Sequence, residues 1–352
     1  MHGWDITLRL SKRISEALLL LTFVIWAGTQ AEAPARAASP QTESTSASAL
    51  PAAQAQAADN SQAPAGQSGD LVIRTDVDEV LLHASVIDNR QHIVTDLDKS
   101  AFTVFEDGKP QTIIHFHHED IPVSMAIVID NSGSMREKRN KVNQAALNLV
   151  RSSNPRDEVC IVNFNDEYYL DQDFTNDLLK MKEALEKINA SGGTALYEAV
   201  VASADHLKRN ARLEKRVLFV VTDGEDNASL ETLEQAVQQL QGEKGPSVYA
   251  IGILGDEEHP KRARRALEIL ADRTGGLAFF PKTLDEVDEI SRTVAHDIRN
   301  QYTIGYKPTS PRSVGGFRTV KVEAKSKGHG KMVVRTKTGY YAGVQGAATG
   351  GK

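Results

Sequence analysis

The sequence predicts an α/β protein: a doubly wound, mostly parallel sheet inserted in a β-sandwich that strands from both ends of the chain form. Between residues 121 and 300, short apolar runs alternate with segments of helical periodicity, which is typical of a parallel sheet covered by helices on both faces. On either side, residues 70–120 and 301–342 have strand character alone. With 352 residues and 40% hydrophobic content, the chain is long enough to bury one large core or two smaller ones.

Residues 1–33 have the pattern of a secretory signal peptide. Basic residues precede the apolar segment 17–27, and Ala31 and Ala33 supply the small side chains of a cleavage site. We therefore expect a secreted, periplasmic or cell-envelope protein. The alternative is that the segment stays uncleaved and anchors the chain in the membrane.

Two segments lack the large apolar residues that a core needs. Residues 34–69 consist mainly of Ala, Gln, Ser and Pro, so they cannot bury enough surface to offset the entropy lost on ordering. We expect a disordered tether here and a flexible tail at 343–352.

The flanking strand blocks contain one clear hairpin signal. Apolar alternation at 102–105 and 112–116 surrounds Asp107-Gly108, and glycine tolerates the positive φ that such a tight turn requires. Each block has too few strands to be stable alone. We therefore expect the blocks at 70–120 and 301–342 to pair in one β-sandwich.

The central segment predicts a Rossmann-like sheet of order 3-2-1-4-5-6. Strands are expected near 124–130, 158–164, 216–222, 247–253 and 276–281, with an edge strand near 168–173. Helices are expected near 136–152, 175–188, 195–210, 228–242, 260–274 and 283–299.

Oxygen-bearing side chains follow the strands at the place where this topology opens a crevice. The first strand ends at Asp130, which Ser132 and Ser134 follow, and the fourth strand ends at Asp223. Strands one and four are neighbours in this order, so the two aspartates should face each other at their carboxyl ends. Thr194 follows a glycine pair in a loop that enters another helix. Two carboxylates and three hydroxyls suit a hard divalent cation.

The pattern Asp130-x-Ser132-x-Ser134, with Thr194 and Asp223, resembles the metal-ion-dependent adhesion site (MIDAS) of von Willebrand factor A (vWA) domains. The resemblance implies that the two serine hydroxyls bind the metal directly, and that Thr194 and the aspartates do so directly or through water. It also implies an open coordination position, which an Asp or Glu of a protein partner completes. Mg²⁺ fits such a set, and Mn²⁺ and Ca²⁺ are possible.

The resemblance extends beyond the motif, with one departure. The segment 102–108 and the ending 339–342 look like those of secreted bacterial vWA-related proteins. In the integrin versions, aspartates directly after the motif build a second cation site. Arg136 and Glu137 stand there in this chain, which places an adjacent site in doubt.

We therefore expect a secreted or envelope-associated binding or adhesion module, not an enzyme. Neither serine lies in a Gly-x-Ser-x-Gly turn, and the sequence places no histidine as a base. The alternatives are a metal-dependent hydrolase and a structural envelope protein whose metal site is unused. A net charge of −6 without a basic stripe argues against nucleic acid as a partner. His115 and His117 would share a strand face, but a third ligand for zinc is missing from the pattern. We also expect the hydroxyls of Ser134 and Thr194 to lie at the surface.

Overall fold

The computed structural model describes residues 79–186, 190–255 and 259–343. The predicted signal peptide and tether lie outside the described residues, as does the predicted tail apart from Gly343. In the described part of the chain, the helices are too short or too polar to cross a membrane.

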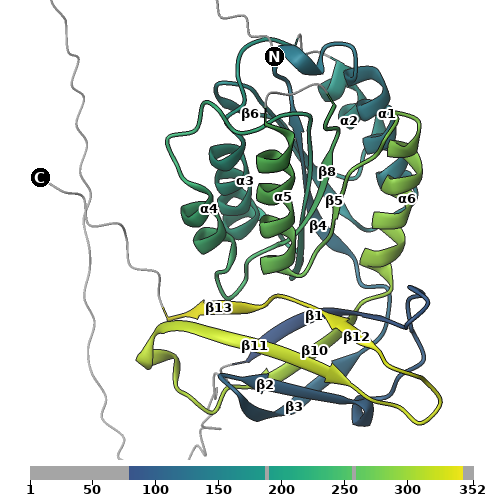
Figure 1. The fold of residues 1–352 in the computed structure, drawn as a ribbon, viewed down its shortest axis with the longest axis vertical. Helices are drawn as coiled ribbons and strands as arrows, with labels where there is room; N and C mark the ends of the chain where they lie inside the picture. Colours follow the sequence, from purple (N-terminus) through teal and green to yellow (C-terminus); the bar gives the residue numbers. More distant parts are fainter. Residues whose placement is uncertain (1–78, 187–189, 256–258, 344–352) are drawn as a thin grey trace, which may run out of the picture. The chain divides into compact units, whose positions relative to one another are not determined.

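The central sheet has six strands in the order β6-β5-β4-β7-β8-β9, which is the predicted order 3-2-1-4-5-6 (Figure 1). Its strands are β4 (Val123–Asp130), β5 (Glu158–Phe164), β6 (Tyr168–Thr175), β7 (Lys215–Thr222), β8 (Ser247–Gly252) and β9 (Ala278–Phe279). Neighbouring strands are parallel, except that β6 pairs antiparallel with β5 at the edge. The strand expected at 276–281 is shorter than predicted, because β9 comprises only Ala278–Phe279.

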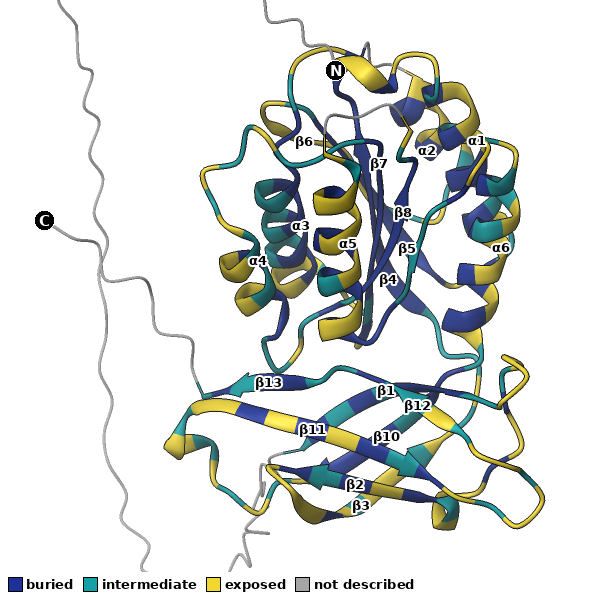
Figure 2. Cartoon of the chain, in the orientation of Figure 1, coloured by how far each residue is buried: buried dark blue, intermediate teal, exposed yellow. Residues whose placement is uncertain are grey.

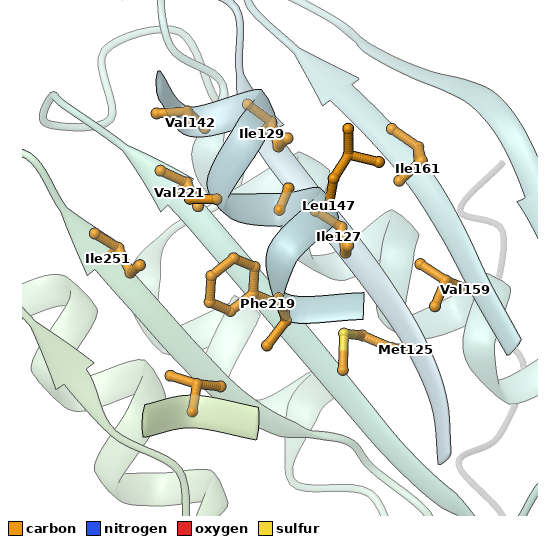
Figure 3. Packing of buried hydrophobic residues seen from close by; sticks show 14 of the residues in the cluster. Met125, Ile127, Ile129, Val142, Leu147, Val159, Ile161, Phe219, Val221 and Ile251 are labelled. Carbon is orange, nitrogen blue, oxygen red and sulfur yellow. The ribbon is translucent and has the colours of Figure 1, made fainter. Parts of the chain in front are cut away.

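Helices cover both faces of this sheet. They are α1 (Arg139–Arg151), α2 (Leu178–Glu186), α3 (Leu196–Asn210), α4 (Leu233–Leu240), α5 (Pro260–Thr274) and α6 (Glu286–Arg299). α1, α2 and α6 lie on one face and α3, α4 and α5 on the other (Figure 1). Side chains alternate between the two faces along a strand. On β4, Ile127 and Ile129 pack in the cluster beneath α1 and α6 (Figure 3), while Ala126 and Val128 pack in the other.

The flanking strands from both ends of the chain interleave in a second sheet of seven strands, in the order β12-β1-β10-β3-β2-β11-β13. They are β1 (Val80–Ile87), β2 (Phe102–Glu106), β3 (Lys109–His117), β10 (Tyr302–Lys307), β11 (Gly316–Ala324), β12 (Val333–Arg335) and β13 (Gly339–Ala342). β10 lies between β1 and β3, and β11 pairs with β2, all antiparallel. The predicted pairing of the two blocks is confirmed. Because the strands form one sheet, the prediction that the two blocks make a β-sandwich is not confirmed.

This second sheet curls around its own core. β11 and β12 stand far apart in the strand order, yet they contact each other. Val80, Leu82, Val104, Tyr302 and other apolar side chains fill the inside, whereas β11 turns every second residue outward (Figure 2). The hairpin between β2 and β3 forms at Asp107-Gly108 as predicted, with φ of 48° and 75°.

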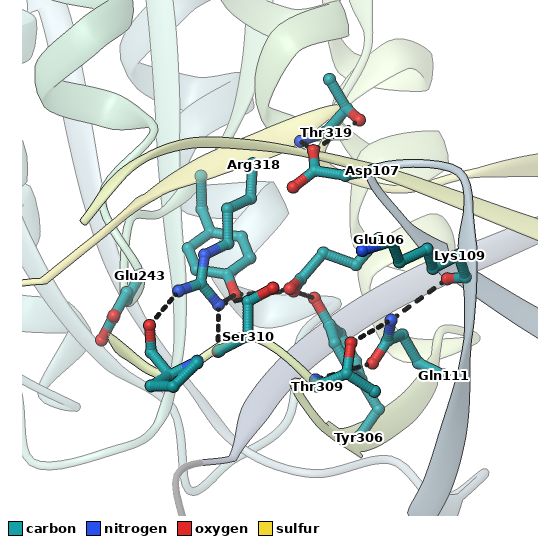
Figure 4. Close-up of polar contacts among 12 residues, drawn as sticks. Glu106, Asp107, Lys109, Gln111, Glu243, Tyr306, Thr309, Ser310, Arg318 and Thr319 are labelled. Carbon is teal, nitrogen blue, oxygen red and sulfur yellow. Dashed lines mark hydrogen bonds and ion pairs between the residues drawn. The ribbon is translucent and has the colours of Figure 1, made fainter. Parts of the chain in front are cut away.

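A buried polar cluster joins four strands of the curled sheet, β2, β10, β11 and β13 (Figure 4). The Glu106 carboxylate accepts hydrogen bonds from the hydroxyls of Tyr306 and Tyr340, at 2.6 and 2.8 Å, and pairs with Arg318 at 3.2 Å. Arg318 also donates to the carbonyl oxygens of Ser310 and Pro311. Both carboxylate oxygens and both terminal guanidinium nitrogens of the pair therefore have protein partners, as buried charges require.

Polar side chains also join the curled sheet to α6 and β8. The buried Asp297 carboxylate of α6 accepts hydrogen bonds of 2.5 Å from both Tyr249 of β8 and Arg335 of β12. Arg335 donates in addition to the Ser85 hydroxyl of β1. This junction lies near the carboxyl end of α6 and in the amino-terminal half of β8. It therefore leaves free the carboxyl ends of the central strands, where the predicted site lies.

Candidate metal site at the carboxyl edge of the central sheet

Asp130 is the last residue of β4 and is fully buried. One of its carboxylate oxygens accepts the Ser132 backbone N–H at 2.8 Å, and the other accepts the Thr222 hydroxyl at 2.6 Å. Burial raises the pKa of this carboxyl group to about 6. With both oxygens engaged, Asp130 fixes the turn that carries Ser132 to the end of neighbouring strand β7.

Ser132, Ser134 and Asp223 form a continuous chain of oxygen atoms. The two serine hydroxyls lie 3.1 Å apart, and the Ser134 hydroxyl donates to Asp223 Oδ1 at 2.8 Å. The serines belong to the loop after β4, in which Gly133–Met135 make a 3₁₀ turn, and Asp223 follows β7 directly. The structure thus brings these three predicted residues together, since β4 and β7 are adjacent parallel strands.

Thr194 reaches the site on a loop that is held in place at several points. The backbone N–H of Gly133 donates to the Gly192 carbonyl at 3.2 Å, which joins the serine loop to the glycine loop. The Asn227 side chain accepts the Thr194 N–H at 2.9 Å. A Cβ added to Gly224 would lie 3.7 Å from Thr194 Oγ1, so this hydroxyl lies against the residue after Asp223. All five predicted residues are therefore gathered at one edge.

The expected surface position holds for one hydroxyl and is wrong for the other. Ser134 is exposed, whereas Thr194 is only 3% exposed because the loop at 224–228 covers it. Asp130, Ser132 and Asp223 are buried as well. Ser134 is thus the member of the set that a partner molecule reaches most easily.

Lys138 was not predicted for this site. Its ammonium group lies 2.6 Å from Asp223 Oδ2, the oxygen that Ser134 does not use. The available signal was spacing, because Lys138 follows Ser134 by four residues and positions four apart face the same side of a helical turn. Thr222, the hydrogen-bond partner of Asp130, was also missed, although each of the two directly follows the last printed pair of the register, Ile129 opposite Val221.

The donor set fits a hard divalent cation better than a soft one. It consists of hydroxyl and carboxylate oxygens, which Mg²⁺, Mn²⁺ and Ca²⁺ prefer. In the described residues, this edge included, His, Cys, Asp and Glu side chains do not gather in threes, so a metal here depends on the serine and threonine hydroxyls beside the two aspartates. His115 in particular bonds to Glu79, at 2.5 Å, on the curled sheet.

The site opens onto a hollow of about 310 Å³. Ser134 and Lys138 lie on one side of it, and the segments 253–255 and 281–284 form the other. The second wall follows β8 and β9, so the hollow continues the carboxyl edge of the sheet. A ligand that enters it would meet the Ser134 hydroxyl and the Lys138 ammonium group.

The sequence of this segment matches a known family. Residues 125–225 match the model of the von Willebrand factor type A domain, and this span contains all five predicted site residues. The chain contains a von Willebrand factor type A domain. The matched span runs from within β4 to just beyond Asp223, so it holds the loops described above.

Individual relatives of this vWA domain are distant. An uncharacterised protein of Synechocystis sp. is 25% identical over 113 residues, which are 31% of this chain and 27% of that protein. The chain thus matches about a quarter of that relative's length. A solved von Willebrand factor type A protein from Catenulispora acidiphila is 16% identical, covers 78% of this chain and 77% of its own, and has a TM-score of 0.44.

Two further solved structures are similar to about half of this chain. The vWF domain of the type V pili tip protein Mfa5 from Porphyromonas gingivalis is 14% identical over 51% of this chain and 97% of that domain, with a TM-score of 0.41. Proximal thread matrix protein 1 of the mussel byssus, solved with a zinc-occupied MIDAS motif, is 16% identical over 55% and 50% of the two chains, with a TM-score of 0.44.

Proposed function

We propose that the vWA domain binds one divalent cation through Asp130, Ser132, Ser134, Thr194 and Asp223, and uses it to bind an acidic group of a protein partner. The observation that carries the proposal is the chain of oxygens from Ser132 through Ser134 to Asp223, with steps of 3.1 and 2.8 Å. It joins loops from two neighbouring strands, and its exposed member lines an open hollow. Such convergence on one edge is what a shared ligand would require.

The residues divide into donors and supports. Ser132, Ser134 and Thr194 supply neutral hydroxyls, and Asp223 supplies a carboxylate, so the set leaves net positive charge on a bound divalent ion. Asp130 is the support: it holds the serine loop through its bond to the Ser132 N–H, and it would reach the ion through a bridging water. When bound, Mg²⁺, or in its place Mn²⁺ or Ca²⁺, would act as an electrophile that attracts a partner's carboxylate.

A binding role is favoured over hydrolysis by the hydrogen bonds of the serines. The Ser134 hydroxyl donates to Asp223, and Asp223 is itself paired with Lys138. Within the described ranges, the hydrogen-bond partners of the Ser132 and Ser134 side chains do not include a histidine. A nucleophilic serine needs an adjacent base that is free to take its proton.

We place the protein outside the cytoplasm, secreted or in the cell envelope. This part of the proposal rests on the signal-peptide pattern at 1–33, with an uncleaved anchor as the alternative. Partners are accordingly proteins of the cell surface or its surroundings that present Asp or Glu.

Affinity capture tests the proposal. The mature protein is immobilised, and surface proteins are applied in Mg²⁺ or in EDTA. We expect partners that are recovered only in Mg²⁺ and that Ser134→Ala loses, because this exposed hydroxyl donates to Asp223 at the opening of the site. The control is Ser313→Ala, an exposed serine in the loop before β11. Equal recovery in Mg²⁺ and EDTA would contradict the proposal.

A further inference from the structure

The ion pair between Lys138 and Asp223 joins an accessible cation to a fully buried carboxylate. The Lys138 side chain is 24% exposed and that of Asp223 is 0% exposed, with 2.6 Å between Nζ and Oδ2. Lys138 also lines the hollow at the site, beside Ser134. Its ammonium group is therefore positioned both to neutralise Asp223 and to move into open space.

Local helix physics does not account for a lysine at this place. Lys138 directly precedes α1, and the first turn of that helix has no acidic residue to balance it. The amino-terminal end of a helix carries partial positive charge, which disfavours a lysine there. The favourable interaction that offsets this cost is the ion pair with Asp223, since an unpaired buried carboxylate would be expensive.

We infer that Lys138 is an internal counter-cation that takes the charge role of the metal at Asp223 and competes with it. This inference rests on the proposed function, because it concerns the same cation site. A divalent ion bound through Asp223 would lie beside a like charge, and repulsion at a poorly solvated site is strong. Lys138 therefore weakens metal binding and stabilises the metal-free domain.

The opposite role for Lys138 makes a different prediction. A hydrogen-bond donor behind a metal ligand orients that ligand, and its removal typically weakens metal binding. If Lys138 acted only in this way, replacing it would lower the affinity. The sign of the change in affinity thus separates competition from orientation.

Calorimetric titration of the full chain with Mn²⁺ measures that sign. We expect Lys138→Met and Lys138→Gln to bind Mn²⁺ roughly tenfold more tightly than the unmodified protein, because each removes the competing charge. Lys138→Gln retains an amide donor for Asp223, so it keeps the site folded if the apolar variant does not. The matched control is Lys141→Met, which removes a charge three residues further on, from the first turn of α1, where Lys141 makes an exposed pair with Asp285. It should change the affinity less than about twofold.

The outcomes distinguish this inference from the proposed function. Tight Mn²⁺ binding by the unmodified protein, with equal or weaker binding by both folded Lys138 variants, would overturn the inference alone. A flat titration for every protein would overturn both. Binding that appears only in the Lys138 variants would support the competition and show that Lys138 keeps the site closed to metal.

Thermal unfolding without metal provides a second readout. In EDTA, Lys138→Met should unfold at a lower temperature than the control Lys141→Met, because Asp223 then remains buried without its counter-charge. With Mn²⁺ present, the same variant should gain more in melting temperature than the unmodified protein, since stabilisation grows with affinity. A smaller gain would contradict competition.

Discussion

Single side chains in this protein are stabilised by partners from distant parts of the sequence. Glu106, Tyr306, Arg318 and Tyr340 form one buried cluster, although they come from β2, β10, β11 and β13. The sequence did not reveal it, because Glu106 follows a strand in a turn signal and resembles an exposed hairpin residue. The cluster depends on strand order, which local patterns do not contain.

Arg318→Met should destabilise the protein by about 3 kcal/mol, because it leaves Glu106 buried with its hydroxyl donors but without a counter-charge. Urea denaturation measures the change. The control Lys321→Met breaks an exposed pair with Glu323 on the same strand and should cost at most about 0.5 kcal/mol. Equal, small effects would mean that the Arg318 pair contributes no more than a surface pair.

The site residues show which part of a site the sequence predicts. Asp130, Ser132, Ser134, Thr194 and Asp223 were predictable because each follows a strand or a glycine turn, and the strand order brings those ends together. Lys138 and Thr222 were not predicted. Lys138 bonds to the Asp223 oxygen that Ser134 leaves free, and Thr222 bonds to the Asp130 oxygen that the Ser132 N–H leaves free. The residues that supply oxygen ligands can therefore be predicted from sequence. The neighbouring side chains that hydrogen-bond to those oxygens cannot.

Secondary-structure elements agree with their predicted positions where an apolar run decides them. β5 has the predicted bounds, and α5 does too. α4 begins at Leu233 instead of residue 228, because the preceding loop is held by Asp226, which accepts the Tyr197 N–H, and by the capping box of Thr232 and Gln235. The contact between Asp226 and Tyr197 forms only when the chain has folded, whereas the capping box is local and marks the helix start in the sequence itself.

The β2–β3 hairpin should be sensitive to a side chain at Gly108. Its φ of 75° is unfavourable for other residues, while the space around it is open, so strain alone opposes Gly108→Ala. We expect a loss of about 1 kcal/mol in unfolding free energy. Gly328→Ala is the control, because Gly328 also has open space and its φ is not positive. Losses of the same size in both variants would exclude backbone strain as the cause.

At the scale of the whole molecule, a buried lysine of the vWA domain lies near Asp297, the carboxylate that joins this domain to the curled sheet. Lys215, the first residue of β7, is 3% exposed and donates to the Ile298 carbonyl at the end of α6. Burial lowers the pKa of its ammonium group to about 8. The unfolded chain, with a lysine pKa near 10.4, binds this proton more strongly.

Lys215 should therefore contribute a rise in stability with pH between about 8 and 10, because the folded protein loses this proton before the unfolded chain would. The gain is about 2 kcal/mol for a shift of this size. Lys337, whose pKa burial also lowers to about 8, contributes in the same direction, and the Cys160 thiol, whose pKa burial raises, contributes in the opposite direction. Above pH 10 the buried tyrosines, whose pKa burial raises, act in the opposite direction. Urea denaturation at pH 8 and pH 10 tests this. The change in stability from pH 8 to pH 10 should be less positive in Lys215→Met than in the unmodified protein, and an equal change in that variant would assign it to other groups.

Metal binding at the carboxyl edge of the central sheet is the central claim, and a Mn²⁺ titration of the full chain tests it most directly. We predict one ion per chain for the unmodified protein and for the control Asp285→Ala. This control removes an exposed carboxylate that pairs with Lys141 of α1. Asp223→Ala should bind no ion, because it removes the carboxylate that joins the hydroxyl chain. A folded Asp223→Ala protein that binds Mn²⁺ as the unmodified protein does would contradict the account.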